Sequence, residues 1–338
     1  MNNRSAGPRS FNTLQRSNRA ARLRRLQEAR ILLLTICALI LLLALTGLVF
    51  LFCHIGHSVG GGTSSGGKSG KIVYGELSVL PTSEEATISI YRGNLILVNK
   101  DHPYHFPTTR IENLSDAEKE AYSVMTYRTT VGSNHPFFVL PNKKNYYMMP
   151  EAARAISRLL TDHYNLYNEA LLLNEGYQIE AEQSGSNYDQ LTGLSAEILN
   201  DVSSPLKDDS RARLIVNGGK YGFIQRFPEG KSSQTGVGGD TGVFRYVGIP
   251  HASYMTNQNL SLEEYIALLQ TSYSYSDSHL LLDTSGNVVT KNAAYEIYYV
   301  AASGESATVP VPKNYRYTIS GDNVGGFIIT VDLNSPVA

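Results

Sequence analysis

Residues 220–231 are the stretch from which the fold of this 338-residue chain can be worked out, and they read Lys220-Tyr-Gly-Phe-Ile-Gln-Arg-Phe-Pro-Glu-Gly-Lys231. The chain around them is 42% hydrophobic and 17% charged, which excludes a wholly disordered protein. Its length suffices for one or two domains with a packed core. A net charge of −1 excludes a nucleic-acid-binding protein that works through bulk positive charge. Two cysteines are too few for a disulfide framework or a cysteine-based zinc finger.

The apolar pattern around this block predicts a mixture of helices and strands. Helices are expected from the capping boxes at Ser115 and Ser261, to about Tyr127 and Gln270, and from Pro150. His163 lies on the apolar face of the Pro150 helix, which favours a packed core histidine over a metal ligand. Residues 283–338 indicate a small β module, either appended to the core sheet or separate. Strands are predicted at 86–91, 95–98, 171–173, 294–300, 315–319 and 327–331.

The first 53 residues differ sharply in charge from the rest. Residues 1–30 carry eight arginines, no lysine and one acid, whereas the 23 residues 31–53 carry no charge. A helix of that length spans about 34 Å, enough to cross a bilayer core. Because the arginines lie on one side only, we expect a single-pass membrane helix, a basic cytoplasmic tail and an extracellular C-terminal region. The alternative, a cleaved signal peptide, is disfavoured because its apolar segment usually runs about 7–15 residues.

Residues 54–72 form a Gly/Ser-rich linker that mimics a nucleotide site. Gly62, four further residues and Gly67-Lys68-Ser69 match the phosphate-binding loop pattern. That motif needs a preceding strand and a following helix, so that backbone amides converge on the phosphates. Neither is predicted here. We therefore expect a flexible spacer and no nucleotide partner.

Block 220–231 resembles the pattern Tyr-Gly-Phe-Ile-x-Arg-Tyr-Pro-x-Gly-Lys of the zinc D-alanyl-D-alanine carboxypeptidases of the vancomycin-resistance type. These enzymes belong to the lysostaphin/D-Ala-D-Ala-peptidase/hedgehog fold group. The resemblance covers about residues 90–270 and implies an α+β core at 73–280, an antiparallel sheet with flanking helices, followed by the β module at 283–338. The other matching blocks, in the family's order, are Leu95-Ile-Leu-Val-Asn-Lys-Asp-His-Pro103, Gly176-Tyr177, Phe244-Arg-Tyr-Val-Gly248 and Leu262-Glu-Glu-Tyr265.

The resemblance fails at the residues that would carry the chemistry. The family binds zinc through a Ser-x-His-x-x-Gly-x-x-x-Asp segment and a later Glu-x-x-His, in which the glutamate is the general base. Anchored on Gly193 and on Phe244-Arg245, the corresponding positions can be read off this sequence. The ligand positions hold Gln190, Glu197 and Val243, the general-base position holds Asp240, and the position of the substrate-binding arginine holds Gln178.

These replacements predict that the family's zinc cofactor is not retained. Valine cannot coordinate a metal, a glutamine oxygen is a poor zinc ligand, and Glu197 alone would hold zinc weakly. Without a metal, no activated water is available for Asp240 to deprotonate. The alternative is a relocated zinc site, although no histidine pair has the spacing of a metal motif. Its candidate ligands are His102, His105, His135, His163, His251 and His279, apart from His54 and His57 beside the membrane span.

Two functions follow from this pattern. The first is a catalytically inactive bacterial cell-wall protein whose groove binds a peptidoglycan stem peptide or a cell-envelope protein. The second is an active D,D-carboxypeptidase that trims terminal D-Ala with a rearranged metal site, and the ligand set argues against it. For Arg245 the alternative to groove lining is a structural salt bridge. The residues expected to line the groove are Gln178, Gln190, Glu197, Asp240 and Arg245.

Overall fold

The computed structural model describes residues 71–79, 88–107, 109–128, 130–131, 135–140, 146–178 and 187–337. The chain divides into two compact units, Met1–Lys68 and Ser69–Ala338, and every element below belongs to the second. The predicted basic tail, membrane helix and nearly all of the linker lie outside the described residues. Among the helices that are described, none has the length and apolar character needed to cross a membrane.

The middle part of the second unit, residues 138–246, contains a five-stranded sheet. Its strand order is β4-β5-β6-β8-β7, and every neighbouring pair is antiparallel except β4 and β5, which are parallel. The predicted antiparallel sheet is therefore confirmed apart from its edge strand. The strands are β4 (Phe138–Val139), β5 (Leu171–Glu175), β6 (Ser195–Leu199), β7 (Phe223–Phe227) and β8 (Asp240–Tyr246).

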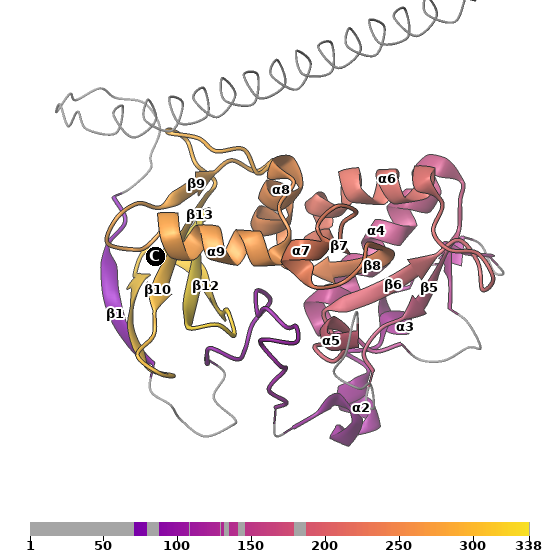
Figure 1. The fold of residues 1–338 in the computed structure, drawn as a ribbon, viewed down its shortest axis with the longest axis horizontal. Helices are drawn as coiled ribbons and strands as arrows, with labels where there is room; N and C mark the ends of the chain where they lie inside the picture. Colours follow the sequence, from indigo (N-terminus) through magenta and orange to yellow (C-terminus); the bar gives the residue numbers. More distant parts are fainter. Residues whose placement is uncertain are drawn as a thin grey trace, which may run out of the picture. The chain divides into compact units, whose positions relative to one another are not determined.

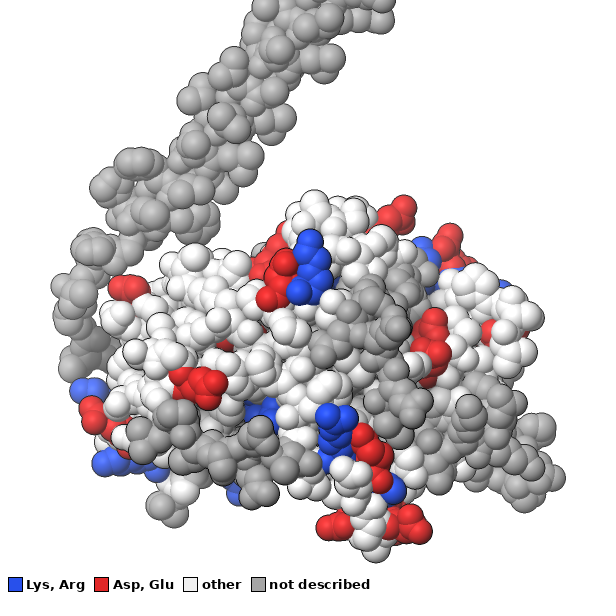
Figure 2. Space-filling model, turned by 60° about the horizontal axis from the view of Figure 1, so that its bottom comes forward, with Lys and Arg blue, Asp and Glu red and all other residues white. Residues whose placement is uncertain are grey.

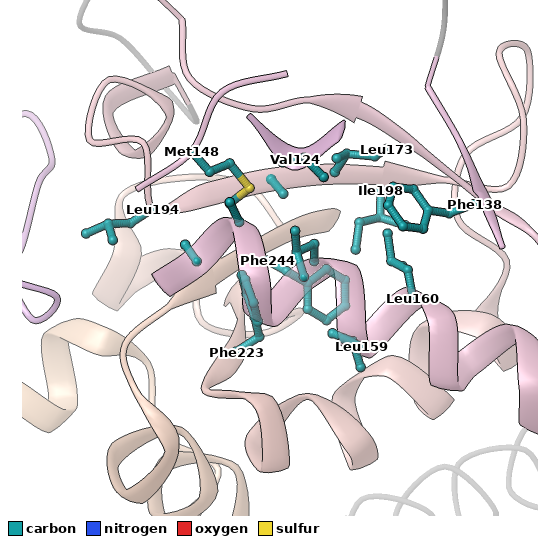
Figure 3. Close-up of a cluster of buried hydrophobic side chains, with 14 of the residues drawn as sticks. Val124, Phe138, Met148, Leu159, Leu160, Leu173, Leu194, Ile198, Phe223 and Phe244 are labelled. Carbon is teal, nitrogen blue, oxygen red and sulfur yellow. The ribbon is translucent and has the colours of Figure 1, made fainter. Parts of the chain in front are cut away.

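Helix α4 (Pro150–Tyr167) covers one face of this sheet (Figure 1). It begins with the predicted proline, whose missing N–H would have no partner in the first turn, and ends at Asn168 in the left-handed conformation. Its apolar side packs Leu159 and Leu160 against Leu173, Ile198 and Phe244 of the sheet (Figure 3). His163, 3% exposed, lies on the same side, which confirms it as a packed core histidine.

The C-terminal residues form a second, separate sheet with the order β12-β13-β10-β9. Both faces of this sheet are buried. On one face, Ile297 packs toward helices α8 (Ile249–Gln258) and α9 (Leu262–Ser272). On the other face, its neighbour Tyr298 packs with the outer strand pair, which is described below. This sheet does not join the five-stranded sheet, and both sheets belong to the same compact unit. The strands are β9 (Leu280–Leu282), β10 (Tyr295–Ala301), β12 (Tyr315–Gly321) and β13 (Gly326–Pro336), with the outer pair β1 (Tyr74–Val79) and β11 (Ala307–Pro312).

Two predicted strands are wrong. Residues 88–91, the described part of one, form turns, and residues 95–98 lie buried without joining a sheet. The second segment is held instead by the turn between β12 and β13. The amide of Leu97 donates to the carbonyl of Asp322 at 2.9 Å, and the Asn323 side chain donates to the Leu97 carbonyl at 2.8 Å. With such partners, the backbone N–H and C=O groups of this apolar segment can form hydrogen bonds without a neighbouring strand.

The helix predicted from Ser115 is confirmed at its start and broken later. Its capping box is present, but the helix divides into α2 (Asp116–Lys119) and α3 (Val124–Tyr127). The break occurs at Ser123, which forms a β-bridge with Tyr147. The remaining short elements are α5 (Asn187–Gln190), α6 (Asp208–Gly218), α7 (Ser232–Thr235), the 3-10 turns at Ile111–Asn113 and Gly219–Tyr221, and the strand pair β2 (Thr130–Val131) and β3 (His135–Pro136).

Candidate functional site

The structure brings the three family ligand positions together on neighbouring elements. Glu197 in β6 lies directly opposite Val243 in β8 and opposite Glu175 in β5. Gln190 ends α5, and its side-chain amide donates to the Glu175 carboxylate at 2.9 Å. The alignment by anchor residues therefore selected positions that meet in space. Glu175, which follows the predicted strand at 171–173, was missed because no family motif marks it.

The donor atoms at these positions do not fit a zinc ion. Val243 is 1% exposed and presents only methyl groups. The Gln190 nitrogen donates to Glu175, its buried oxygen has no partner among the described residues, and Glu197 accepts a hydrogen bond from Asn174 at 2.5 Å. A catalytic zinc needs about three nitrogen, sulfur or carboxylate ligands. Across the described residues, no three His, Cys, Asp or Glu side chains cluster closely enough to hold a metal.

Four of the described histidines make contacts elsewhere. His251, the candidate nearest the site in sequence, places one ring nitrogen 2.7 Å from the Tyr265 hydroxyl and the other 2.8 Å from that of Thr330. Burial lowers its pKa to about 3, so the ring is neutral and both nitrogens are occupied. Three other described rings have partners of their own: His163 contacts Glu169, His279 contacts Glu296, and His105 stacks on Tyr91.

The remaining predicted groove residues divide into two groups. The amide of Gln178 donates to the carbonyl of Gln190 at 3.3 Å, which places Gln178 beside the ligand positions. The backbone of Asp240 begins β8 and pairs with Phe227. Arg245, in contrast, is fully buried and forms an ion pair with Asp189. Its guanidinium also donates to the carbonyl of Ile96 at 3.0 Å, so it belongs to a structural salt bridge and does not line a groove.

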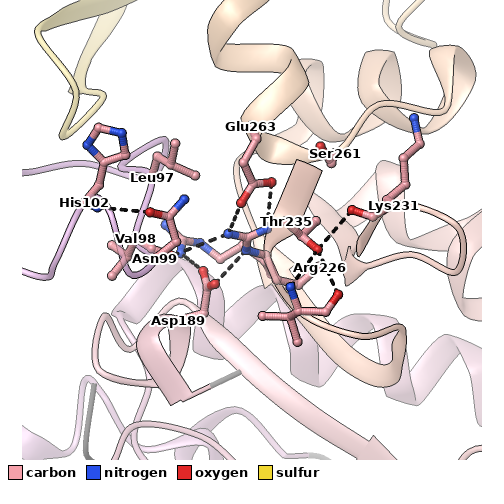
Figure 4. Close-up of polar contacts among 12 residues, drawn as sticks. Leu97, Val98, Asn99, His102, Asp189, Arg226, Lys231, Thr235, Ser261 and Glu263 are labelled. Atoms are coloured by element: carbon pink, nitrogen blue, oxygen red, sulfur yellow. Dashed lines mark hydrogen bonds and ion pairs between the residues drawn. The ribbon is translucent and has the colours of Figure 1, made fainter. Parts of the chain in front are cut away.

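Arg245 is one of four charged side chains in a buried network, and Figure 4 labels the other three, Asp189, Arg226 and Glu263. Asp189 accepts from Arg245 and, at 2.6 Å, from Arg226, and Arg226 in turn makes two bonds of 2.8 and 3.0 Å to Glu263 in α9. Burial opposes the charge of Arg226, but the two carboxylates outweigh it and raise its pKa. Two cations and two anions make the cluster neutral, which limits the cost of burying it. Because Asp189 precedes Gln190 in α5, the network fixes the first ligand position.

Comparison with known proteins identifies relatives of the chain. No protein-family model matches the chain. The chain is 31% identical over 269 residues to a D-alanyl-D-alanine carboxypeptidase of Enterococcus faecium, covering 74% of this chain and 79% of that protein. It is 40% identical over 75 residues to the bifunctional D-Ala-D-Ala dipeptidase and D-Ala-D-Ala carboxypeptidase VanXYC of Enterococcus gallinarum, covering 22% of this chain and 40% of that protein.

The fold has a solved counterpart as well. The vancomycin-resistance D,D-dipeptidase VanXYg, solved with a D-Ala-D-Ala phosphinate analog, superposes with a TM-score of 0.55 at 23% identity, covering 78% of this chain and all of the other. The fold thus defines a D-Ala-D-Ala peptidase-like protein. The chain belongs to the family of the vancomycin-resistance D-alanyl-D-alanine carboxypeptidases and dipeptidases.

Proposed function

We propose that this protein is a catalytically inactive member of the family, which binds peptidoglycan stem peptides at the outer face of the cell membrane. The observation that carries the proposal is Val243, a buried apolar side chain directly opposite Glu197 at a family ligand position. The polar side chains around it hydrogen-bond to one another: Gln190 to Glu175, and Asn174 to Glu197. These residues therefore lack the donor set that would activate a water molecule.

Stem peptide is the ligand that the relatives support. Their names state D-alanyl-D-alanine carboxypeptidase and D-Ala-D-Ala dipeptidase activity, and one was solved with a D-Ala-D-Ala phosphinate analog. The scaffold that positions the groove persists here, because α5 is tied to β7, β8 and α9 by the buried network. The uncharged segment 31–53 and the arginine-rich tail before it support a membrane anchor with the C-terminal region outside.

The test follows a synthetic stem pentapeptide ending in D-Ala-D-Ala by NMR, with the full-length protein in detergent and added zinc. We expect an intact peptide after hours and broadened peptide signals. The variant Gln178→Ala should reduce the broadening, whereas Arg316→Gln, an exposed position on β12, should not.

Two results would contradict the proposal in different ways. Release of free D-Ala that a chelator abolishes would show an active enzyme with a relocated metal site. An intact peptide without broadening would show that the groove no longer binds stem peptide, and would direct the search to cell-envelope proteins.

A further inference from the structure

Segment 94–98 connects the two large cores of the second unit, although it belongs to no sheet. Its side chains alternate in direction, as they do in any extended chain. Ile96 and Val98 pack in the core that contains α4 and the five-stranded sheet. Leu95 and Leu97 pack in the core between α8, α9 and the C-terminal sheet. A movement of this segment would therefore change the packing of both cores.

The backbone of the segment also contacts both sides. On one side, the Ile96 carbonyl accepts from the Arg245 guanidinium at 3.0 Å. On the other side, the Leu97 carbonyl accepts from the Asn323 side chain at 2.8 Å. The segment thus lies between the buried ion-pair network and the turn that joins β12 to β13, and it is hydrogen-bonded to each.

The β12–β13 turn has a second connection to the network, through α9. One oxygen of the fully buried Asp322 accepts from the three amides of residues 324–326 at 2.8, 2.8 and 2.9 Å, which fixes the shape of the turn. Its other oxygen accepts from Gln270 of α9 at 2.9 Å. The same helix carries Glu263, which pairs with Arg226. The turn is therefore held to the network by the segment and by α9.

Asn323 is the residue of the turn that holds the segment most directly. Its backbone is left-handed, with φ 60°, a conformation that asparagine tolerates. Its side-chain nitrogen donates to the carbonyls of Leu97, His102 and Pro103 at 2.8, 3.3 and 3.2 Å. Its buried side-chain oxygen has no partner among the described residues, so the contacts of this side chain are those of the nitrogen.

The network links the segment to the candidate groove. Arg226 and Arg245 both pair with Asp189, the residue before Gln190. The Gln190 carbonyl in turn accepts from the amide of Gln178 at 3.3 Å. The two guanidinium groups and the Asp189 carboxylate are fully buried, whereas the face in Figure 2 shows acidic and basic side chains interspersed at the surface. The link is therefore internal and is screened little by salt.

We propose that the C-terminal β module positions the candidate groove, and that Asn323 is a positioning residue which acts on Gln178 and Gln190 through segment 94–98. Without the Asn323 side chain, three carbonyls of residues 97–103 lose their donor. The segment then holds Arg245 less firmly, and α5 gains freedom to move. This effect on local order does not depend on a ligand. Its consequence for affinity rests on the proposed function, in which the groove binds stem peptide.

Hydrogen–deuterium exchange of the full-length protein in detergent, measured by mass spectrometry of its peptides, tests the proposal. Asn323→Gly keeps the left-handed turn and removes the donor. Asn292→Gly makes the same change at an exposed left-handed asparagine, with φ 54°, and is the matched control. Asn323→Gly should speed exchange in residues 187–194 at least fivefold and in α4 less than twofold. Asn292→Gly should leave both within twofold.

A second variant keeps the test decisive if Asn323→Gly fails to fold. The Leu95 amide donates to the Ser320 hydroxyl at 2.9 Å, so Ser320→Ala loosens the same segment by a smaller change. It should also speed exchange in residues 187–194 more than in α4. Unchanged exchange of residues 187–194 in both variants would overturn the proposal. Equal acceleration in α4 would overturn it too, because that result shows a general loss of stability.

Titration with the stem pentapeptide separates this proposal from the proposed function. If the parent protein binds the peptide, Asn323→Gly should weaken the affinity at least threefold and Asn292→Gly should leave it within 1.5-fold. Unchanged affinity alongside faster exchange would refute the effect on the groove. If the parent protein does not bind the peptide, the proposed function fails, and the exchange measurement alone decides whether the β module positions α5.

Discussion

Replacing Asp189 by asparagine should strongly destabilise the protein, because it removes the shared partner of two fully buried guanidinium groups. Asp189 is the shared acceptor of Arg226 and Arg245, and both guanidinium groups are fully buried. Removing one partner of a buried ion pair costs about 3–5 kcal/mol, since the other charge is left without compensation. Arg226 keeps its two bonds to Glu263, so Arg245 bears most of the loss. We therefore expect Asp189→Asn to lower the free energy of unfolding by about 3 kcal/mol.

Thermal unfolding of residues 69–338, followed by far-UV circular dichroism, measures the effect. For a domain of this size, each kcal/mol shifts the midpoint by roughly 2–4 °C, so Asp189→Asn should lower it by about 6–12 °C. The matched control is Lys231→Gln, which breaks an ion pair whose side chains are 18% and 26% exposed and should cost less than about 1 kcal/mol. If the free energy of unfolding of Asp189→Asn lies within about 1 kcal/mol of the parent's value, the buried network does not stabilise the position of α5.

Three further outcomes are expected. Burial depresses the pKa of His251 to about 3. As the pH drops from 6.5 toward 3, this residue therefore takes up a proton in the unfolded chain but not in the folded one. The free energy of unfolding then falls by about 1.4 kcal/mol per pH unit. In urea titrations at several pH values, the free energy of unfolding of His251→Gln should lack this contribution to the pH dependence. Zinc should raise the unfolding midpoint of Gln190→His/Val243→His by several degrees, reversibly with a chelator, and leave the parent unchanged. Deleting residues 31–53 should move the protein from the membrane fraction to the soluble fraction. Retention of the shortened protein in the membrane fraction would contradict the proposal that these residues anchor the chain.

Elements with local signals were predicted from the sequence. Helix α4 begins at Pro150 and α9 follows Ser261 because each start depends on residues within one turn, and both capping boxes are present as predicted. The strands β5, β10, β12 and β13 were predicted from their apolar patterns. The apolar run at 95–98 gave the wrong element, because its partners Asp322 and Asn323 are more than 220 residues away along the chain.

The candidate site shows the same division. Anchor residues placed Gln190, Glu197 and Val243 at positions that do meet, because β6 and β8 are neighbours in the sheet. Sequence could not decide between a groove and a salt bridge for Arg245, because its partner Asp189 is 56 residues earlier and its burial depends on segment 94–96. Glu175 and Glu263 were missed for the same reason: each acquires its role only from a residue on another element.

The substituted ligand positions form a self-consistent set of contacts. Glu175 and Glu197 face each other across β5 and β6, and like charges directly opposite destabilise a sheet. Each carboxylate here receives an amide hydrogen bond, from Gln190 and from Asn174, which offsets part of that repulsion. Val243 adds buried apolar surface beside them. The neutral ion-pair network ties the neighbouring α5 to β7, β8 and α9, so the residues of this site stabilise one another.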